Sequence, residues 1–137
     1  GFPLKAKEYK RLKKFGCWEN EFKYMPAVLI PEKKPRVYSK SQNIEIDLDV
    51  LFRAQSPKNF GLLVLPLNIV YKMRGGQTPR SSVTLRMNLS RIRFMGQTLK
   101  DVLDSSGNRL KIYAVRWHGN KIIQHETLSN PVVIKVR

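Results

Sequence analysis

Apolar residues occupy every second position in the segment 43–53, NIEIDLDVLFR. Successive side chains of a β-strand point to opposite faces, so this alternation predicts a strand with one face buried in a core. The other face of the predicted strand carries three acids, Glu45, Asp47 and Asp49.

Several further segments have the composition of short strands. The apolar positions of segment 83–94 change parity near Ser90, which predicts a β-bulge there. The loop RGGQTPRSS precedes this segment and predicts a hairpin with the strand before it. Seven to eight short strands with little helical patterning are typical of an antiparallel β-sandwich or barrel, so we expect an all-β fold. The predicted strands are 43–53, 60–65, 67–73, 83–94, 110–117, 121–128 and 132–137, with a short strand or helical turn at 98–104.

The N-terminal residues have a helical pattern instead. Leu4, Leu12 and Phe15 share one side of a helical wheel, and basic residues occupy the other side. This pattern predicts a short basic amphipathic helix. The helix either docks on the body or frays, because an isolated helix of about a dozen residues is marginal in water.

The next segment, 26–36, contains three prolines and predicts an extended edge or a linker. A chain of 137 residues is long enough for one packed core and too short for two. We therefore expect a basic N-terminal helical arm at 1–25 and a single β-rich domain at 26–137.

The chain is strongly basic. It holds 26 Lys and Arg against 10 Asp and Glu, a formal net charge of +16 at pH 7. The excess is uneven, at +7 in residues 1–40, −1 in 41–70 and +10 in 71–137. Like charges at this density repel one another, so we expect a polyanionic partner such as nucleic acid, an anionic membrane or an acidic protein.

Cysteine content and hydropathy restrict the compartment. A single cysteine, Cys17, excludes an internal disulfide and fits a reducing environment. No apolar run approaches the roughly twenty residues that span a bilayer, and no signal peptide is recognisable. We expect an intracellular protein, cytoplasmic or nuclear, without a transmembrane segment.

The basic helix is the first candidate binding site. Six cations on about three helical turns would place a row of charges along a phosphate backbone. At a membrane, the apolar side of the helix would instead enter the acyl boundary, with the lysines at the headgroups. The basic residues are Lys5, Lys7, Lys10, Arg11, Lys13 and Lys14.

A second candidate site is a series in which arginine outnumbers lysine five to one. If the strands flanking the loop RGGQTPRSS form a hairpin, the series converges on one sheet face. Arginine binds phosphate bidentately and stacks on bases, so we expect phosphate binding that weakens with salt. Pairing of some members with the acids of segment 43–53 is the alternative. The members are Lys72, Arg74, Arg80, Arg86, Arg91 and Arg93.

An aromatic residue completes the candidate nucleic-acid interface. Trp117 is the preferred residue for stacking on an unpaired base, because it lies beside a predicted tight turn and next to Arg116. The other aromatic residues that could stack on bases are Trp18, Tyr24, Tyr38, Tyr71 and Tyr113. No zinc-finger, helix-turn-helix or RNA-recognition motif is present, which leaves sequence-specific recognition unsupported.

These patterns predict a non-enzymatic structural protein that binds RNA or DNA through phosphate contacts, largely independently of sequence and without a cofactor or metal. A basic arm on a compact β body is an arrangement that viral capsid and packaging proteins use. Homo-oligomerisation through an edge strand such as 132–137 would multiply the contacts.

Two alternatives remain open. One is a matrix-like peripheral protein that self-associates on anionic membranes and bridges them to a nucleoprotein. The other is a metal-dependent nuclease that uses Glu45, Asp47 and Asp49 as metal ligands.

Overall fold

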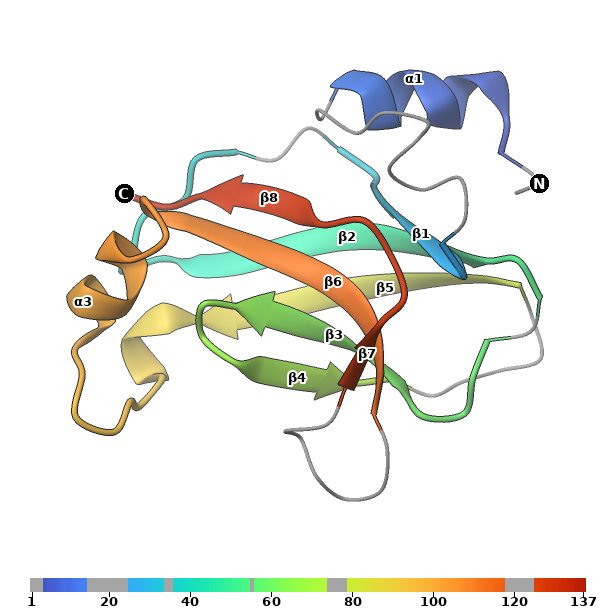
Figure 1. The fold of residues 1–137 in the computed structure, drawn as a ribbon. Helices are drawn as coiled ribbons and strands as arrows, with labels where there is room; N and C mark the ends of the chain where they lie inside the picture. Colours follow the sequence, from blue (N-terminus) through green and yellow to red (C-terminus); the bar gives the residue numbers. More distant parts are fainter. Residues whose placement is uncertain (1–3, 15–24, 34–35, 55, 74–78, 118–124) are drawn as a thin grey trace.

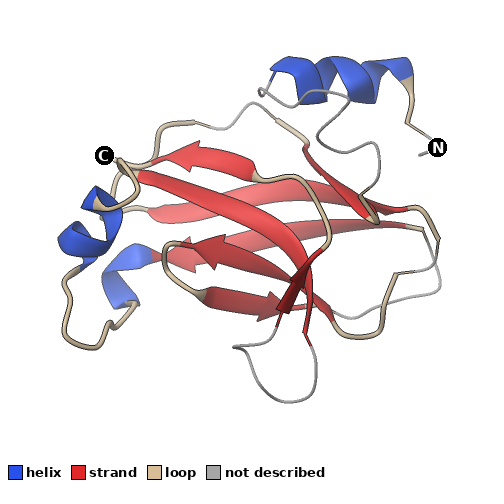
Figure 2. Cartoon of the chain, in the orientation of Figure 1, coloured by secondary structure: helices blue, strands red, loops and turns tan. Residues whose placement is uncertain are grey.

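The computed structural model describes residues 4–14, 25–33, 36–54, 56–73, 79–117 and 125–137. Two antiparallel sheets face each other in a sandwich-like arrangement, with a short N-terminal helix beside them (Figure 1, Figure 2). The predicted all-β fold of about eight strands is confirmed. The elements are α1 (Ala6–Lys14), β1 (Ala27–Pro31), β2 (Asn43–Phe52), β3 (Phe60–Leu65), β4 (Ile69–Lys72), β5 (Arg80–Asn88), the 3-10 helix η1 (Leu89–Arg91), α3 (Leu99–Asp104), β6 (Arg109–Trp117), β7 (His125–Thr127) and β8 (Val132–Lys135).

The three-stranded sheet has the order β1-β2-β5. The alternating apolar residues of β2 point inward and are buried, from Ile44 through Leu48 to Phe52, whereas Leu51 points outward. On the outer face Glu45 lies opposite Arg86, and Asp47 lies opposite Thr84. Directly opposite residues of antiparallel strands interact, so these polar pairs favour β5 as the partner of β2.

The five-stranded sheet is built around β6. One edge of β6 pairs with β3, and β4 continues the sheet beyond β3. The other edge is shared, because β7 pairs with β6 at 115–117 and β8 pairs with it at 109–112. The hydrophobic core lies between the two sheets. Phe52 and Phe60 meet there edge to face, with ring centroids 5.2 Å apart.

A buried asparagine joins the two sheets along one edge of the sandwich. Asn130, between β7 and β8, is only 1% exposed. Its side-chain amide accepts a hydrogen bond from the Leu29 N–H in β1 (3.0 Å) and donates one to the Leu29 carbonyl (2.9 Å). Nearby, the Ala27 N–H donates to the Leu128 carbonyl (3.0 Å). The outer edge of β1 therefore obtains from the second sheet the partners that a neighbouring strand would supply.

The end of β8 is covered on the side away from β6. The Tyr38 N–H donates to the Lys135 carbonyl (3.0 Å), and the Arg137 N–H donates to the Tyr38 carbonyl (2.9 Å). The Val136 N–H points the other way, to the Asn108 carbonyl (2.8 Å). The edge at 132–137, predicted as a place for oligomerisation, is thus partly occupied within the chain.

Two local predictions are wrong. The strands on either side of the loop RGGQTPRSS form no hairpin, because β4 belongs to the five-stranded sheet and β5 pairs with β2. Residues 74–78 of that loop lie outside the described residues. In place of the predicted bulge near Ser90, β5 ends at Asn88, whose side chain accepts a hydrogen bond from the Ser90 N–H and caps η1. Of the two possibilities left open for 98–104, a short strand or a helical turn, the structure has the helix α3.

Candidate nucleic-acid interface

Helix α1 docks on the outer face of the three-stranded sheet with its apolar side toward β1 (Figure 1). Leu12 is fully buried in a cluster with Val28 and Ile30 of β1 and Leu51 of β2. These strand residues point away from the core between the sheets, so the helix has an apolar site of its own. Of the two outcomes left open by the sequence, docking is the one observed.

A charged contact also joins α1 to β5. The Glu8 side chain is 8% exposed, and its carboxylate lies 2.7 Å from the guanidinium of Arg80, the first residue of β5. An ion pair with one buried partner is screened by salt less than an exposed pair. Arg80, a predicted phosphate ligand, is therefore engaged in holding the helix.

The lysines of α1 point away from the sheet. Lys7 and Lys10 are three residues apart, and Lys10 and Lys14 four, so the three form one stripe on the side opposite Leu12. At 1.5 Å per residue this stripe is about 10 Å long. We call the exposed lysines of this helix the helix surface: Lys7, Lys10, Lys13 and Lys14.

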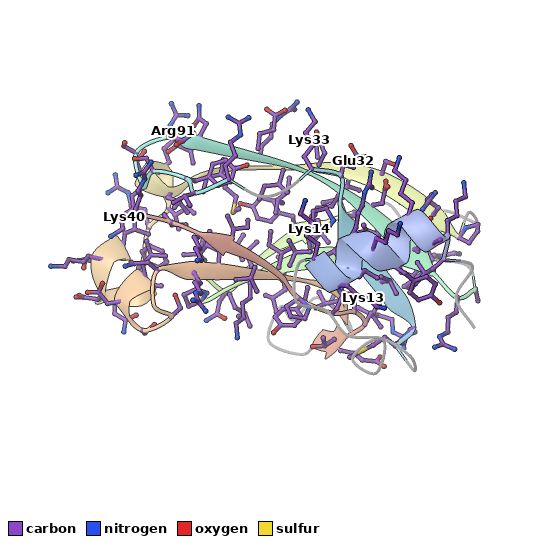
Figure 3. The ribbon with its side chains drawn as sticks, turned by 90° about the horizontal axis from the view of Figure 1, so that it is seen from above. Lys13, Lys14, Glu32, Lys33, Lys40 and Arg91 are labelled. Carbon is purple, nitrogen blue, oxygen red and sulfur yellow. The ribbon has the colours of Figure 1, made fainter. Side chains whose placement is uncertain are left out.

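Further basic residues lie around the helix surface. Lys5 is exposed just before α1, and Arg11 is half-exposed on the flank of the helix. Seen from above, Lys33 lies on the same side of the molecule as Lys14, and the exposed acid Glu32 lies beside it (Figure 3). Lys5 and Arg11 therefore extend the positive charge of the helix surface, and Lys33 and Glu32 add one charge of each sign on the same side.

The predicted arginine series does not share one face. Lys72 belongs to the five-stranded sheet, whereas Arg80 and Arg86 belong to the three-stranded sheet. The single arginine-rich face depended on the hairpin, so this interpretation is wrong. Arg91 and Arg93 are exposed beyond the end of β5. Arg74 lies outside the described residues.

The acids of β2 have partners on the outer face of their own sheet. The Arg86 Nε lies 3.4 Å from the Glu45 carboxylate, with both side chains largely exposed. Asp47 accepts a hydrogen bond from the Thr84 hydroxyl (2.6 Å), and Asp49 accepts one from Ser82 (2.7 Å). Within the described ranges, no group of three or more His, Cys, Asp or Glu residues is placed to hold a metal ion.

Arg116 and Trp117 are consecutive in β6 and point to opposite faces. The Arg116 guanidinium lies 2.6 Å from the Glu126 carboxylate of β7. Arg116 also lines a cleft of about 430 Å³ at one end of the sandwich, together with Phe52 and Leu128. The two residues predicted as one nucleic-acid site are therefore separated by the sheet.

Trp117 lies on the outer face of the five-stranded sheet, over Gly61 of β3. A Cβ atom at Gly61 would lie 2.9 Å from Cζ3 of the Trp117 ring, so only glycine leaves room for this packing. The Lys72 Nζ lies 5.6 Å from the ring centroid, within cation–π distance. The Trp117 N–H donates to the Asn59 carbonyl (3.2 Å), and the Asn59 amide donates to the Trp117 carbonyl, which fixes the end of β6.

Apart from Tyr113, one of the aromatic residues considered for base stacking, the other residues on this face escaped the sequence analysis. The even positions of β6 face the core, so its odd positions share the outer face with Trp117. The register then adds the facing residues of β3, β4 and β8. The alternation in segment 109–117 could have identified the outward residues of β6. Only the strand register shows which residues of the other strands lie beside them. We call this surface the sheet face: Leu63, Leu65, Val70, Lys72, Arg109, Lys111, Tyr113, Val115, Trp117, Val133 and Lys135.

Comparison of the chain with family models, curated proteins and solved structures finds no match. In the part of the chain that the structure describes, no helix combines the length and apolar content needed to cross a bilayer. The case for a function therefore depends on the chemistry of the two surfaces.

Proposed function

We propose that this protein binds nucleic acid through its phosphate backbone, largely independently of sequence, and that the helix surface makes the principal contacts. The observation that carries this proposal is the docking of α1 by its apolar side, with Leu12 fully buried and four lysines turned to solvent. The helix thereby presents cations from a fixed position instead of from a mobile tail.

Charge and spacing support a phosphate ligand. Lys7, Lys10 and Lys14 form a stripe about 10 Å long, and each strand of a duplex carries one phosphate per rise of about 3.4 Å along the duplex axis. Each lysine that neutralises a phosphate releases a condensed counterion. Lysine acts as a point charge without directional base recognition, which agrees with binding independent of sequence.

The docking of α1 favours nucleic acid over a membrane. Insertion of the helix into a bilayer would require its apolar side, and Leu12 already packs against Val28 and Leu51. Burial of a leucine side chain stabilises the docked state by about 1.5 to 3 kcal/mol. Binding to a phosphate backbone does not require the helix to undock, because its lysines are exposed in the docked state.

The test compares two variants of equal charge. In the helix variant, Lys10 and Lys14 of α1 are replaced by Gln. In the control variant, Gln replaces Lys58 and Lys100, which are exposed and lie outside α1. Binding to a duplex and to anionic phosphatidylserine vesicles is measured over a salt titration. We expect the helix variant to lower the slope of log affinity against log salt by about 2, since each phosphate contact contributes about 0.9.

The control variant should change this slope by less than about 0.9, which is the contribution of one phosphate contact. Equal changes in both variants would mean that net charge, and not the helix surface, governs binding. Binding to vesicles in preference to the duplex would favour the membrane alternative and contradict the proposal.

A further inference from the structure

The sheet face lies on the side of the sandwich that faces the viewer in Figure 1 and combines aromatic, apolar and basic residues. Among the described elements, neither α1 nor α3 lies over it (Figure 1). Leu63 and Val115 at its centre are 3% and 0% exposed, although both point away from the core. Tyr113 and Trp117 are half-buried around them, and Val133 is 40% exposed. The part of the sheet face that a ligand can reach therefore consists mainly of Val133, the two half-buried rings and the exposed basic side chains around them.

The two aromatic residues are positioned by one strand. Tyr113 and Trp117 are four residues apart on β6, which separates them by about 13 Å along the outer face. The absence of a side chain at Gly61 lets the Trp117 ring lie on the sheet instead of standing away from it. The Trp117 ring is therefore held against the sheet, and this limits the conformational entropy that a ligand would have to remove.

The charged side chains that the register places on the sheet face are all basic. They come from three strands and are all exposed. The outer face of the three-stranded sheet differs, because it carries Glu45, Asp47 and Asp49. An apolar, aromatic surface bordered by cations suits a ligand that combines flat rings with negative charge. The cations are Lys72, Arg109, Lys111 and Lys135.

We propose that the sheet face binds unpaired nucleotides of a single-stranded nucleic acid, with bases stacked on Trp117 and Tyr113 and phosphates beside the surrounding cations. This inference rests on the proposed function and extends it to a preference for single strands. Aromatic residues that stack bases beside a positive surface are the general means by which proteins bind single strands. A duplex keeps the faces of its bases stacked on each other, so it gains no such contact.

Lys72 has a defined part in this binding. In the free protein its ammonium lies over the Trp117 ring, 5.6 Å from the centroid. Lys72 is exposed, so it can move aside when a base approaches the ring. An exposed cation–π contact is weaker than a base stacked on an aromatic ring, so the exchange favours the bound state. The displaced ammonium then lies near the phosphate of the stacked nucleotide.

The first experiment leaves the sheet face intact. The chain has two tryptophans, so a Trp18→Phe variant makes Trp117 the sole source of tryptophan fluorescence. A single-stranded oligonucleotide and a duplex of the same length are titrated into this variant. We expect the single strand to quench Trp117 fluorescence because a base stacks on the ring, and the duplex to quench it far less.

The second experiment measures affinity. A Trp117→Leu/Tyr113→Leu variant should lose about 25-fold or more in affinity for the single strand, since stacking on each aromatic contributes a factor of about five or more. Its affinity for the duplex, which we assign to the helix surface, should not change. Lys72→Glu, at an exposed position, should also weaken single-strand binding without affecting folding.

The outcomes separate the inference from the proposed function. The inference is wrong if both probes bind without quenching Trp117 and the Trp117 and Lys72 variants keep their affinity. The proposed phosphate binding would be unaffected by that result. Binding of neither probe overturns both. A sheet face that packs against a second copy instead would make the monomer–oligomer equilibrium sensitive to Trp117→Leu while oligonucleotides leave the fluorescence unchanged.

Discussion

Replacement of Asn130 by Ala should destabilise the sandwich far more than a neutral surface substitution. The Asn130 side chain makes hydrogen bonds of 3.0 and 2.9 Å with the N–H and carbonyl of Leu29, and both residues are 1% exposed or less. The substitution removes both partners and leaves two buried backbone groups unpaired. Each unpaired group costs about 1 to 3 kcal/mol, so the free energy of unfolding should fall by about 2 to 6 kcal/mol.

Such a loss is a large part of the 5 to 15 kcal/mol that typically stabilises a domain. Urea unfolding followed by circular dichroism measures it, and an unchanged m-value would show that the unfolded state is unaffected. Asn43→Ala, at an exposed position in β2, is the matched control and should change stability by about 0.5 kcal/mol or less. If Asn130→Ala and Asn43→Ala give the same small change, the amide of Asn130 does not join the sheets as argued.

Two further predictions concern single residues. Leu12→Ala removes a fully buried side chain and should destabilise the docked helix by about 2 to 5 kcal/mol, which is enough to undock so short a helix. Amide hydrogen exchange should then become faster in α1, while β3 and β6 keep their protection. Equal acceleration in all three elements would contradict this prediction. Burial raises the pKa of the Tyr71 hydroxyl above its ordinary value of 10.0, so the folded chain keeps the phenolic proton at a pH where the unfolded chain releases it. The free energy of unfolding should therefore fall as the pH rises past about 10, and Tyr71→Phe should remove this part of the dependence in urea unfolding at a series of pH values.

Local pattern was enough to predict most elements. The alternation in 43–53 identified β2 and its buried face, and the helical wheel identified α1 together with the direction of its lysines. Both inferences depend on a period within one segment, and neighbouring residues set that period. The strand–loop–strand pattern around RGGQTPRSS also looks local, but a hairpin forms only if the two strands pair with each other.

Non-local contacts determine which strands pair. β5 pairs with β2, more than thirty residues earlier, where Glu45 lies opposite Arg86 and Ser82 reaches Asp49. β4 pairs with β3 across a turn in which Asn68 has a positive φ of 57°. No periodicity in either strand reports these partners. The same limit explains why Trp117 was predicted with Arg116, its neighbour in sequence, and not with Lys72, its neighbour in space.

The way α1 is held determines how reversible its interactions with polyanions can be. The docking depends on the burial of Leu12 and on an ion pair whose acid, Glu8, is almost wholly withdrawn from solvent. Apolar burial does not weaken as ionic strength rises, and an enclosed carboxylate is screened little. If the proposed function holds, a salt concentration high enough to release the polyanion leaves the helix in place, so binding resumes on dilution without any refolding step.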